Sequence, residues 1–265
     1  MTVLPDPAVP PDVYTEDYYR ETCMGAEGFL GPNGAGGDPM YREYLRRCGL
    51  APGQVLVDVG CGRGELLAEA ARLGAARAVG IEYAPAAVAL ARETIARADA
   101  SHVAEVHQAD ARALPVADAS VDAATMLDVV EHLAPAELKT ALAEVGRVRR
   151  PGGRLLVHTM PNRTIYTVTY RMLRIGPARR RLWPRDPRND WERAMHVNEQ
   201  SLGSLRRSLR RAGFTGVRAT LGHQVYDAFL PDPAARTWLH RLAAHRATAR
   251  LGRADLWAHA FAPYR

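Results

Sequence analysis

Three glycines at alternate positions follow a short apolar run and lead directly into a stretch with helical spacing. The run covers residues 55–57, and the glycines are Gly60, Gly62 and Gly64. Glycine permits a tight turn and a close approach of the backbone to a ligand, and a helix start offers unpaired N–H groups. Asp58 precedes the first glycine by two positions, where a carboxylate favours a cationic ligand group over a pyrophosphate. The segment therefore predicts a loop that binds a positively charged ligand.

Further acidic residues stand where the next predicted strands end. Glu82, Asp110 and Asp128 each follow a short apolar run. Open α/β sheets bind ligands at the carboxyl ends of their strands, where Glu82 can accept both hydroxyls of a ribose and Asp110 can accept from the amino group of an adenine. Each acid taken alone is also explained as a solvated loop residue or a helix cap. Their order along the chain predicts one ligand cleft.

Three histidines are candidates for a general base near that cleft. His132 follows the fourth predicted strand, His158 lies near the end of the fifth, and His196 lies in a segment that we expect to fold back over the cleft. A histidine pKa near neutrality suits proton transfer. The alternative for His132 is a histidine that packs against the ligand from a helix start. The alternative for the other two is a hydrogen-bonded structural histidine.

From residue 54 onwards, short apolar runs alternate with helical stretches. This rhythm predicts βαβ units and a parallel sheet covered by helices on both faces. The expected strands cover residues 55–57, 78–81, 103–107, 121–127, 154–159 and 216–221, and the expected helices cover the stretch up to residue 73 and residues 85–97, 135–148 and 201–212.

The segments flanking this core differ from it in composition. Near the N-terminus, Tyr14, Tyr18 and Tyr19 open a predicted short helix over residues 14–30, which a glycine-rich turn at residues 31–37 follows. A later stretch combines tyrosines and tryptophans with many arginines, which is typical of a substrate cap. The predicted division is residues 1–50 as a leader and helical lid, 51–160 as the ligand-binding core, 161–200 as an inserted cap, and 201–265 as a final core helix and strand with a helical tail.

The series of motifs resembles that of the class I S-adenosylmethionine-dependent methyltransferases over about residues 40–220. The resemblance implies a Rossmann-like α/β fold with a seven-stranded, mostly parallel sheet, in which residues 154–159 and 216–221 would supply the final antiparallel hairpin. It also implies S-adenosylmethionine as the cofactor. The matching segments are residues 58–64, Glu82, Asp110 with Ala111, residues 128–133 and residues 149–153.

By this resemblance, each part of the cofactor has its own group of residues. Gly60, Cys61 and Gly62 would hold the methionine part, Glu82 the ribose, and Asp110 with Ala111 the adenine. Asp58, Gly64, Tyr83 and Asp128 complete the expected cofactor site. Methyl transfer needs alignment of the reactants, and a base where the nucleophile is a hydroxyl. We therefore expect an O-methyltransferase that acts on a sugar, glycoside or other secondary metabolite, in carbohydrate or natural-product biosynthesis.

Two other functions remain open from the sequence. The net charge of +6 and the pI near 9.5 agree with a nucleic-acid methyltransferase. However, residues 128–131 lack the Pro-Pro-aromatic motif of the amino-methylating enzymes of that class, so no nucleic-acid partner is expected. The other function is that of a non-catalytic, cofactor-binding partner protein. We expect instead a small-molecule or oligosaccharide acceptor, with a homo-oligomer as an open possibility.

The rest of the sequence gives expectations for metal binding and for the cellular location of the protein. No spacing demands a metal, so none is predicted, although Asp128, Glu131, His132 and His196 form an alternative candidate set for Mg²⁺. The three cysteines include no CxxC pair, which argues against a disulfide framework or a structural zinc site. No secretory signal is recognisable, nor any apolar run of the roughly 20 residues that a membrane span needs. We therefore expect a cytoplasmic protein without a membrane span.

Overall fold

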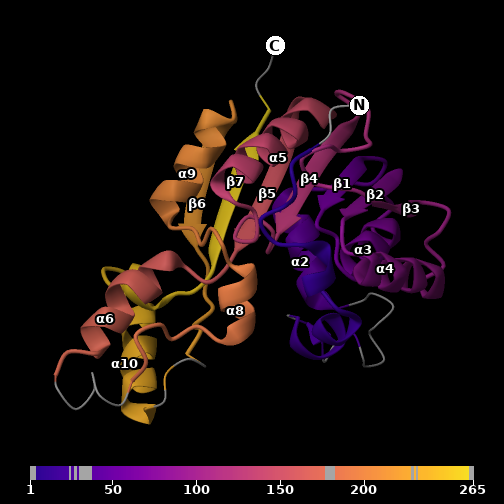
Figure 1. Ribbon diagram of the computed structural model, residues 1–265. Coiled ribbons are helices and arrows are strands. Elements are labelled where there is room, and N and C mark those ends of the chain that lie inside the picture. The colour runs from indigo at the N-terminus through magenta and orange to yellow at the C-terminus, as the bar shows by residue number, and fades with distance from the viewer. Residues whose placement is uncertain are drawn as a thin grey trace.

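The computed structural model describes residues 4–23, 25–26, 29, 38–176, 183–227, 230 and 232–262. These residues build a seven-stranded sheet with the order β3-β2-β1-β4-β5-β7-β6 (Figure 1). The neighbouring strands β3, β2, β1, β4 and β5 run parallel to one another, whereas β7 runs antiparallel to both β5 and β6. The predicted seven-stranded, mostly parallel sheet is confirmed. The strands are β1 (Val55–Val59), β2 (Arg77–Glu82), β3 (Ala104–Gln108), β4 (Val121–Leu127), β5 (Arg149–Thr159), β6 (Thr215–Leu221) and β7 (Leu256–Phe261).

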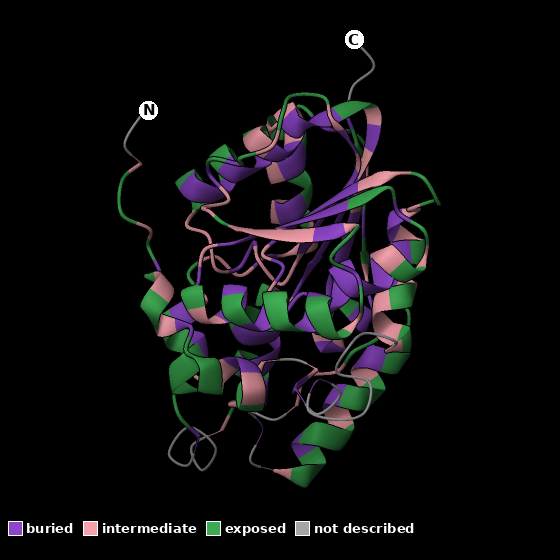
Figure 2. Cartoon of the chain, turned by 90° about the vertical axis from the view of Figure 1, so that its right-hand side faces the viewer, coloured by how far each residue is buried: buried purple, intermediate pink, exposed green. Residues whose placement is uncertain are grey.

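Helices cover both faces of this sheet, because the central strands are apolar on both sides. Along β1, Val57 and Val59 pack into one core with α5 and α9, and Leu56 packs into another with α2, α3 and α4. Figure 2 shows buried strands between helices whose outer faces are exposed. The α-helices are α2 (Pro39–Cys48), α3 (Glu65–Arg72), α4 (Pro85–Arg97), α5 (Pro135–Val148), α6 (Tyr170–Leu173), α8 (Asp190–Met195), α9 (Leu202–Arg211), α10 (Pro233–Ala244) and α11 (Ala249–Gly252).

Short turns of other helix types occur outside the core. They are the 3₁₀ turn η1 (Pro11–Val13) and the π-helical turns η2 (Tyr18–Thr22) and η3 (Ile165–Thr169). The helix expected over residues 14–30 is thus represented by η2 among the described residues. The glycine-rich turn expected at residues 31–37 lies outside them. No helix within the described ranges is long and apolar enough to cross a membrane.

The expected pairing of residues 154–159 with residues 216–221 is wrong. β7 lies between them, so Leu156 of β5 faces His259 of β7, and Thr220 of β6 faces Trp257. The sequence pattern predicted a helical tail here because β7 contains alanines, which are strong helix formers. In the sheet, Ala258 and Ala260 enter one core while Trp257 enters the other, so strand alternation rather than propensity determines this segment.

The segment after β6, whose role the sequence does not predict, packs against the expected cap. Tyr170 and Leu173 of α6 share a buried cluster with Leu239 of α10 and with Trp183. Figure 1 shows α6 and α10 side by side beyond one end of the sheet. Two insertions, one between β5 and β6 and one between β6 and β7, therefore build this part of the molecule together.

Candidate active site

A cavity of about 370 Å³ lies at the carboxyl ends of β1, β2 and β4. The N-terminal segment contributes Tyr14, Tyr18 and Tyr19 to its lining, and the region around α8 contributes Trp191 and His196. Gly64 and His158 are the two predicted site residues that are not among the lining residues. Those that line the cavity are Asp58, Gly60, Cys61, Gly62, Glu82, Tyr83, Asp110, Ala111, Asp128, His132 and His196.

The glycine loop is held against β2 by its own backbone. The N–H groups of Gly60 and Cys61 donate to the carbonyl of Ile81 at 2.7 and 3.1 Å. Gly60 has a φ of 75°, and a Cβ there would lie 2.3 Å from Val129 Cγ2. Gly64 is the N-cap of α3, and a Cβ there would meet the backbone of Ala91 in α4 at 3.0 Å. Gly64 therefore allows two helices to approach each other, whereas Gly60 shapes the cavity wall.

Gly60→Ala is expected to destabilise the protein by about 1–3 kcal/mol more than Gly53→Ala does, because overpacking adds to backbone strain. Gly53 is the matched control, since its φ of 77° is nearly the same and nothing lies within 4 Å of its Cβ position. Urea denaturation of both variants measures the difference. Equal losses would show that the contact with Val129 relaxes freely.

Two buried carboxylates flank the loop. Asp58 accepts a hydrogen bond from the Thr125 hydroxyl at 2.6 Å, and burial raises its pKa to about 7. Glu82 accepts from the backbone N–H groups of Gly62, Tyr83 and Ala84 at 3.1, 2.9 and 3.0 Å, and burial raises its pKa as well. Because desolvated carboxylates gain from a positive or hydrogen-bonding ligand, both residues fit a cofactor that carries a cationic end and a ribose.

Asp110 has a partner that the sequence analysis missed. Its carboxylate binds the Arg112 guanidinium in a two-pronged contact, with Oδ2 to Nη2 at 2.7 Å. Arg112 also contacts Glu137 of α5 at 3.3 Å. The Asp-x-Arg spacing is the signal that could have revealed this pair. Because two-pronged arginine contacts fix carboxylate geometry, Arg112 positions Asp110 at the cavity edge.

A second missed group ties the N-terminal segment to the glycine loop. Arg63, which stands between two of the glycines, donates from Nη1 to the carbonyl of Tyr19 at 2.6 Å and from Nε to Glu65 at 3.0 Å. Tyr41 donates to the same Glu65 carboxylate at 2.8 Å. The Tyr14 ring meets the Tyr83 ring edge-on at 5.6 Å. These contacts hold Tyr14 and Tyr19 over the cavity, and the Tyr18 ring packs edge-on against both of them.

His132 and His196 lie together at the cavity wall, with ring centroids 4.9 Å apart and near-perpendicular planes. The Tyr14 hydroxyl is 2.9 Å from His132 Nδ1. Burial, reinforced by His196, lowers the pKa of His132 to about 3, and burial also lowers that of His196. Both rings are therefore neutral near pH 7.

Glu131 completes a cluster with these histidines. One ligand atom from each of the three side chains lies within 4.8 Å of the others. Glu131 Oε2 accepts from the Thr159 hydroxyl at 2.9 Å, and burial together with nearby Asp128 raises the pKa of Glu131. The structure thus brings together three of the four residues that the sequence grouped as an alternative metal set.

Backbone contacts bring His196 to its place. The N–H groups of Val197 and Asn198 donate to the carbonyl of Glu131 at 3.0 and 2.9 Å, and the Asn198 side chain donates to the carbonyl of Leu133 at 2.9 Å. The sequence alone gives no signal for these bonds, because they join segments more than sixty residues apart. They fix the end of α8 against the turn that carries His132.

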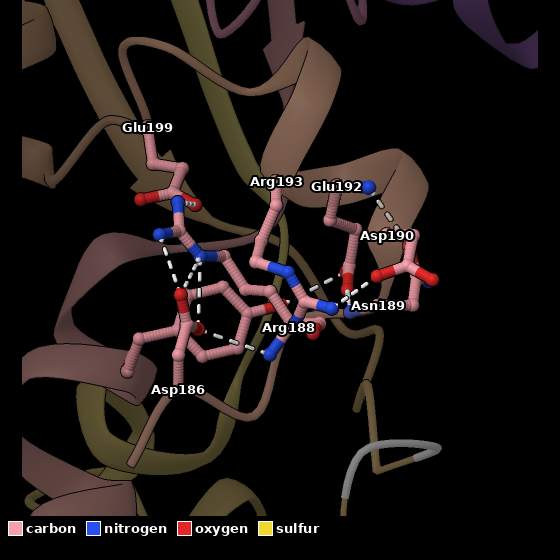
Figure 3. Close-up of polar contacts among 8 residues, drawn as sticks. Asp186, Arg188, Asn189, Asp190, Glu192, Arg193 and Glu199 are labelled. Atoms are coloured by element: carbon pink, nitrogen blue, oxygen red, sulfur yellow. Dashed lines mark hydrogen bonds and ion pairs between the residues drawn. The ribbon is translucent and has the colours of Figure 1, made fainter. Parts of the chain in front are cut away.

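A polar network supports α8 from its outer side. Figure 3 shows Arg188 between Asp186 and Glu199, with contacts of 2.8 and 3.0 Å. Asn189 caps α8 by accepting from the Glu192 N–H at 2.8 Å, and the Glu192 carboxylate accepts from the Asn189 N–H in return. This capping box fixes the direction in which α8 leads to His196.

The expectation that His158 faces the cavity is wrong. Its side chain is fully buried, with Nδ1 2.9 Å from Asp128 and Nε2 3.8 Å from Asp255. The rings of Tyr44 and Trp257 pack on it at centroid distances of 6.1 and 4.4 Å. Burial alone would lower the pKa of His158, but the two carboxylates outweigh it and raise the pKa to about 10. A histidine that is already protonated near pH 7 cannot act as a base there.

Comparisons with known proteins agree with this fold and cavity. Residues 57–157 match the family model described as a methyltransferase domain. The "O-methyltransferase cnsE" of Penicillium expansum is 36% identical over 46% of this chain and 43% of its own length. A "Probable S-adenosylmethionine-dependent methyltransferase" of Mycolicibacterium smegmatis is 33% identical over 69% of this chain and 59% of its own length. The chain thus spans less than two thirds of these relatives.

A solved structure extends the comparison of the fold. Phosphoethanolamine N-methyltransferase 2 of Haemonchus contortus, in complex with phosphomonomethylethanolamine and S-adenosylhomocysteine, superposes with a TM-score of 0.62 at 15% identity. The match covers 94% of this chain and 60% of that one. Together with the sheet order and the loop at residues 58–64, these findings place the chain in the class I S-adenosylmethionine-dependent methyltransferases.

Proposed function

We propose that this protein transfers a methyl group from S-adenosylmethionine to a hydroxyl of a small polar acceptor. The observation that carries the proposal is the place of His132, 2.9 Å from the Tyr14 hydroxyl and at the wall of the cavity that Asp58 and Glu82 also line. The name of the Penicillium relative, an O-methyltransferase, supports the same acceptor atom. Because the chain spans only part of its relatives, the activity of the whole protein is part of this proposal.

Methyl transfer to a hydroxyl requires the protein to position the two reactants and to accept one proton. When bound, the cofactor supplies a methyl group activated by a sulfonium. The cofactor would supply the methyl carbon to the acceptor oxygen, and its sulfur would keep the electron pair of the broken carbon–sulfur bond. His132 takes the proton of the acceptor hydroxyl on Nε2, provided that Nδ1 carries its own hydrogen towards Tyr14. Asp58 and Glu82 would hold the cofactor in the cavity for this transfer.

The residues around α8 suit a sugar or glycoside acceptor. Trp191 and Tyr226 line the same cavity and offer aromatic faces, and the Glu192 carboxylate, which accepts from Tyr166 and from the Asn189 N–H, also lines it. Such a mixture binds the apolar faces and the hydroxyls of a polar ring. A natural-product acceptor with hydroxyls on an aromatic ring has the same two requirements, so the shared chemistry is a hydroxylated ring.

We also infer the organisation of the chain. Residues 1–50 serve as leader and lid, residues 51–160 as the cofactor core, and residues 161–200 as the acceptor cap, while residues 201–265 complete the core and add α10 to the cap. The packing of α6 on α10 supports the last point. The cytoplasmic location and the homo-oligomer stay predictions.

The test is a methyl-transfer assay with radiolabelled S-adenosylmethionine on the purified full chain. The acceptor panel begins with hydroxylated sugars and glycosides and continues with phenolic natural products. Calorimetric titration with S-adenosylmethionine and S-adenosylhomocysteine runs in parallel. Transfer to a hydroxyl supports the proposal. Binding of the cofactor with label appearing on nitrogen, on nucleic acid or on no acceptor contradicts it.

Removal of residues 1–20 is expected to weaken S-adenosylhomocysteine binding by roughly 10-fold or more. Tyr14 and Tyr19 are each 6% exposed and close the cavity, and each aromatic contact contributes on the order of 0.5–1.5 kcal/mol. The matched variant Tyr14→Phe keeps the ring but loses the hydroxyl beside His132. It should slow turnover while leaving cofactor affinity nearly unchanged. Wild-type affinity in the truncated protein would show that this segment is not a lid.

A further inference from the structure

We propose that Asp255, which does not line the cavity, sets the charge that Asp128 presents to the cofactor. Asp128, His158 and Asp255 form a charged row that leads from the cavity wall to the start of β7. Asp255 would thereby raise the affinity for S-adenosylmethionine, which carries a positive sulfonium, relative to that for the product S-adenosylhomocysteine, whose sulfur is neutral. This inference rests on the cofactor of the proposed function, but not on the acceptor or on the role of His132.

Asp128 is tied to His158 at two points. Its backbone N–H donates to the His158 carbonyl at 3.0 Å, and its Oδ1 lies 2.9 Å from the ring Nδ1. The φ of Asp128 is 53°, in the left-handed region that is unfavourable for a residue with a side chain. The side chain is 28% exposed and lines the cavity. The two contacts therefore hold a strained residue with its carboxylate at the cavity wall.

Asp255 occupies a place that the surrounding chain leaves for a carboxylate. Its Oδ1 accepts from the Gln224 N–H and its Oδ2 accepts from Trp257 Nε1, each at 2.8 Å. A Cβ at Gly222 would overlap Oδ2, so only a glycine leaves room for this carboxylate after β6. Burial works against ionisation of Asp255, but its contacts with His158, Trp257 and the Gln224 N–H outweigh burial and lower its pKa. Asp255 is therefore negatively charged near pH 7.

The charged row carries one net negative charge near pH 7. Against the effect of burial, the two carboxylates raise the pKa of His158 to about 10, so one positive ring stands between two negative groups. Asp128 Oδ1 and both ring nitrogens make no hydrogen bond within the described part of the chain, so charge links the row. Asp128 and His158 alone would form a neutral pair. Because His158 and Asp255 are buried, water screens their charges little, and the negative charge of Asp255 acts on the nearby cavity.

The other titratable groups beside the row do not offset this charge. Burial raises the pKa of Tyr44, which packs on the His158 ring, so its hydroxyl is neutral. Arg47 lies over the Trp257 ring but binds Glu43 at 2.9 Å, and this pair adds no net charge. Burial together with Asp128 raises the pKa of Glu131, which favours its protonated form. The charge of Asp255 is thus left for a cation in the cavity.

Calorimetric titration of the full chain with S-adenosylmethionine and with S-adenosylhomocysteine tests the charge balance. The readout is the ratio of the two Kd values, because a loss of packing alone weakens both ligands alike. Asp255→Asn makes the row neutral and should shift this ratio against S-adenosylmethionine by about 3-fold or more. Asp118→Asn is the matched control, since it removes the same charge from an exposed side chain that does not line the cavity. It should leave the ratio unchanged.

A second substitution makes the pattern specific to charge. His158→Gln leaves two negative charges in the row, so the ratio should shift towards S-adenosylmethionine. The double variant with Asp255→Asn keeps only the charge of Asp128, which equals the net charge of the wild-type row. Its ratio should return to the wild-type value, whereas two losses of packing would add to each other.

Nitrogen NMR of the histidine-labelled wild type tests the row without any variant, should a variant fail to fold. An ordinary histidine is neutral at about pH 8.5, whereas the His158 ring should still give an imidazolium signal there. Absence of an imidazolium at this pH overturns the proposal. An unchanged ratio in Asp255→Asn, or a double variant that shifts further than Asp255→Asn alone, overturns it as well.

The methyl-transfer assay is scored separately from these titrations. If the ratio follows the expected pattern while no acceptor hydroxyl is methylated, the proposed function falls and the role of Asp255 stands. If methyl transfer succeeds while the ratio ignores the charge of the row, the proposed function stands and this inference falls. A wild-type protein that binds neither ligand contradicts both.

Discussion

Replacement of Glu82 by alanine is expected to weaken S-adenosylmethionine binding by roughly 100-fold or more. The Glu82 carboxylate is 5% exposed and reaches the cavity from the end of β2. Hydrogen bonds to a charged group contribute about 1.5–3 kcal/mol each, so the loss of two ribose contacts gives an effect of this size. The substitution also removes the acceptor for the Gly62 N–H, which loosens the glycine loop.

Two variants separate these contributions in calorimetric titration. Glu82→Gln keeps one oxygen near the Gly62 N–H but loses the charge, and we expect about a 10-fold weakening from it. Glu105→Ala removes an acid from the neighbouring strand β3, where Glu105 binds exposed Arg77 and does not line the cavity. It should bind like the wild type. Undiminished binding by Glu82→Ala would contradict the assignment of the ribose site.

His158→Gln is expected to destabilise the fold by about 3–5 kcal/mol near pH 7. The change leaves Asp128 and Asp255 without their shared positive partner, and the unpaired charge on the buried Asp255 is costly. Asp255 also accepts from Trp257 Nε1 at 2.8 Å and from the Gln224 N–H at 2.8 Å, so it cannot easily turn towards solvent. Urea denaturation measures the loss.

The pH dependence of this effect has a defined sign. The pKa of His158 is about 10 in the folded protein and about 6.5 when unfolded. The folded state therefore binds the proton more tightly, and this contribution is fully present below pH 6.5 and is lost as the pH rises towards 10. Asp128, Asp255, Tyr44 and Trp257 surround the ring.

A double variant checks the electrostatic cause. In His158→Gln with Asp255→Asn, one of the two unpaired charges is gone, so part of the lost stability should return. The difference between wild type and His158→Gln should also shrink from pH 7 to pH 10. A loss that is independent of pH, and that the second substitution does not relieve, would mean that ring packing rather than charge makes His158 important.

The cofactor side of the site was largely predictable because its signals are local. The glycines of the loop and Asp58 stand within one short segment, and Glu82 follows the next strand. In a parallel sheet the ends of neighbouring strands lie side by side, so order along the chain gives proximity in space. The structure places these residues around one cavity.

The acceptor side depends on contacts that no local pattern encodes. His196 was expected over the cleft from composition alone, but its position beside His132 results from the backbone bonds of Val197 and Asn198 to Glu131. Arg63 gave no distinct signal in an arginine-rich chain, and the Asp-x-Arg spacing of Arg112 was not recognised. Their partners Tyr19 and Asp110 become apparent once the segments are packed.

His158 illustrates a limit of strand-end reasoning. Along β5, Leu155 and Val157 point to the core under α5, and Leu156 points to the core under α2. Alternation places His158 on the same side as Leu156, where Tyr44 of α2 covers it. The sequence shows that side chains alternate along a strand, but it does not show which of the two faces a given side chain points to. A residue at a strand end can therefore face either the cavity or the core.

The position of β7 between β5 and β6 has a consequence for the order of folding. In the described sheet, β6 is joined to the other strands through β7, which follows it in the chain after α10 and α11. Strands β1 to β5 can assemble from neighbouring segments, but β6 cannot join the sheet until β7 has paired with β5. Until then the edge of β5 is exposed, and exposed strand edges invite aggregation. We therefore expect the late, long-range arrival of β7 to limit both the folding rate and the yield of native protein.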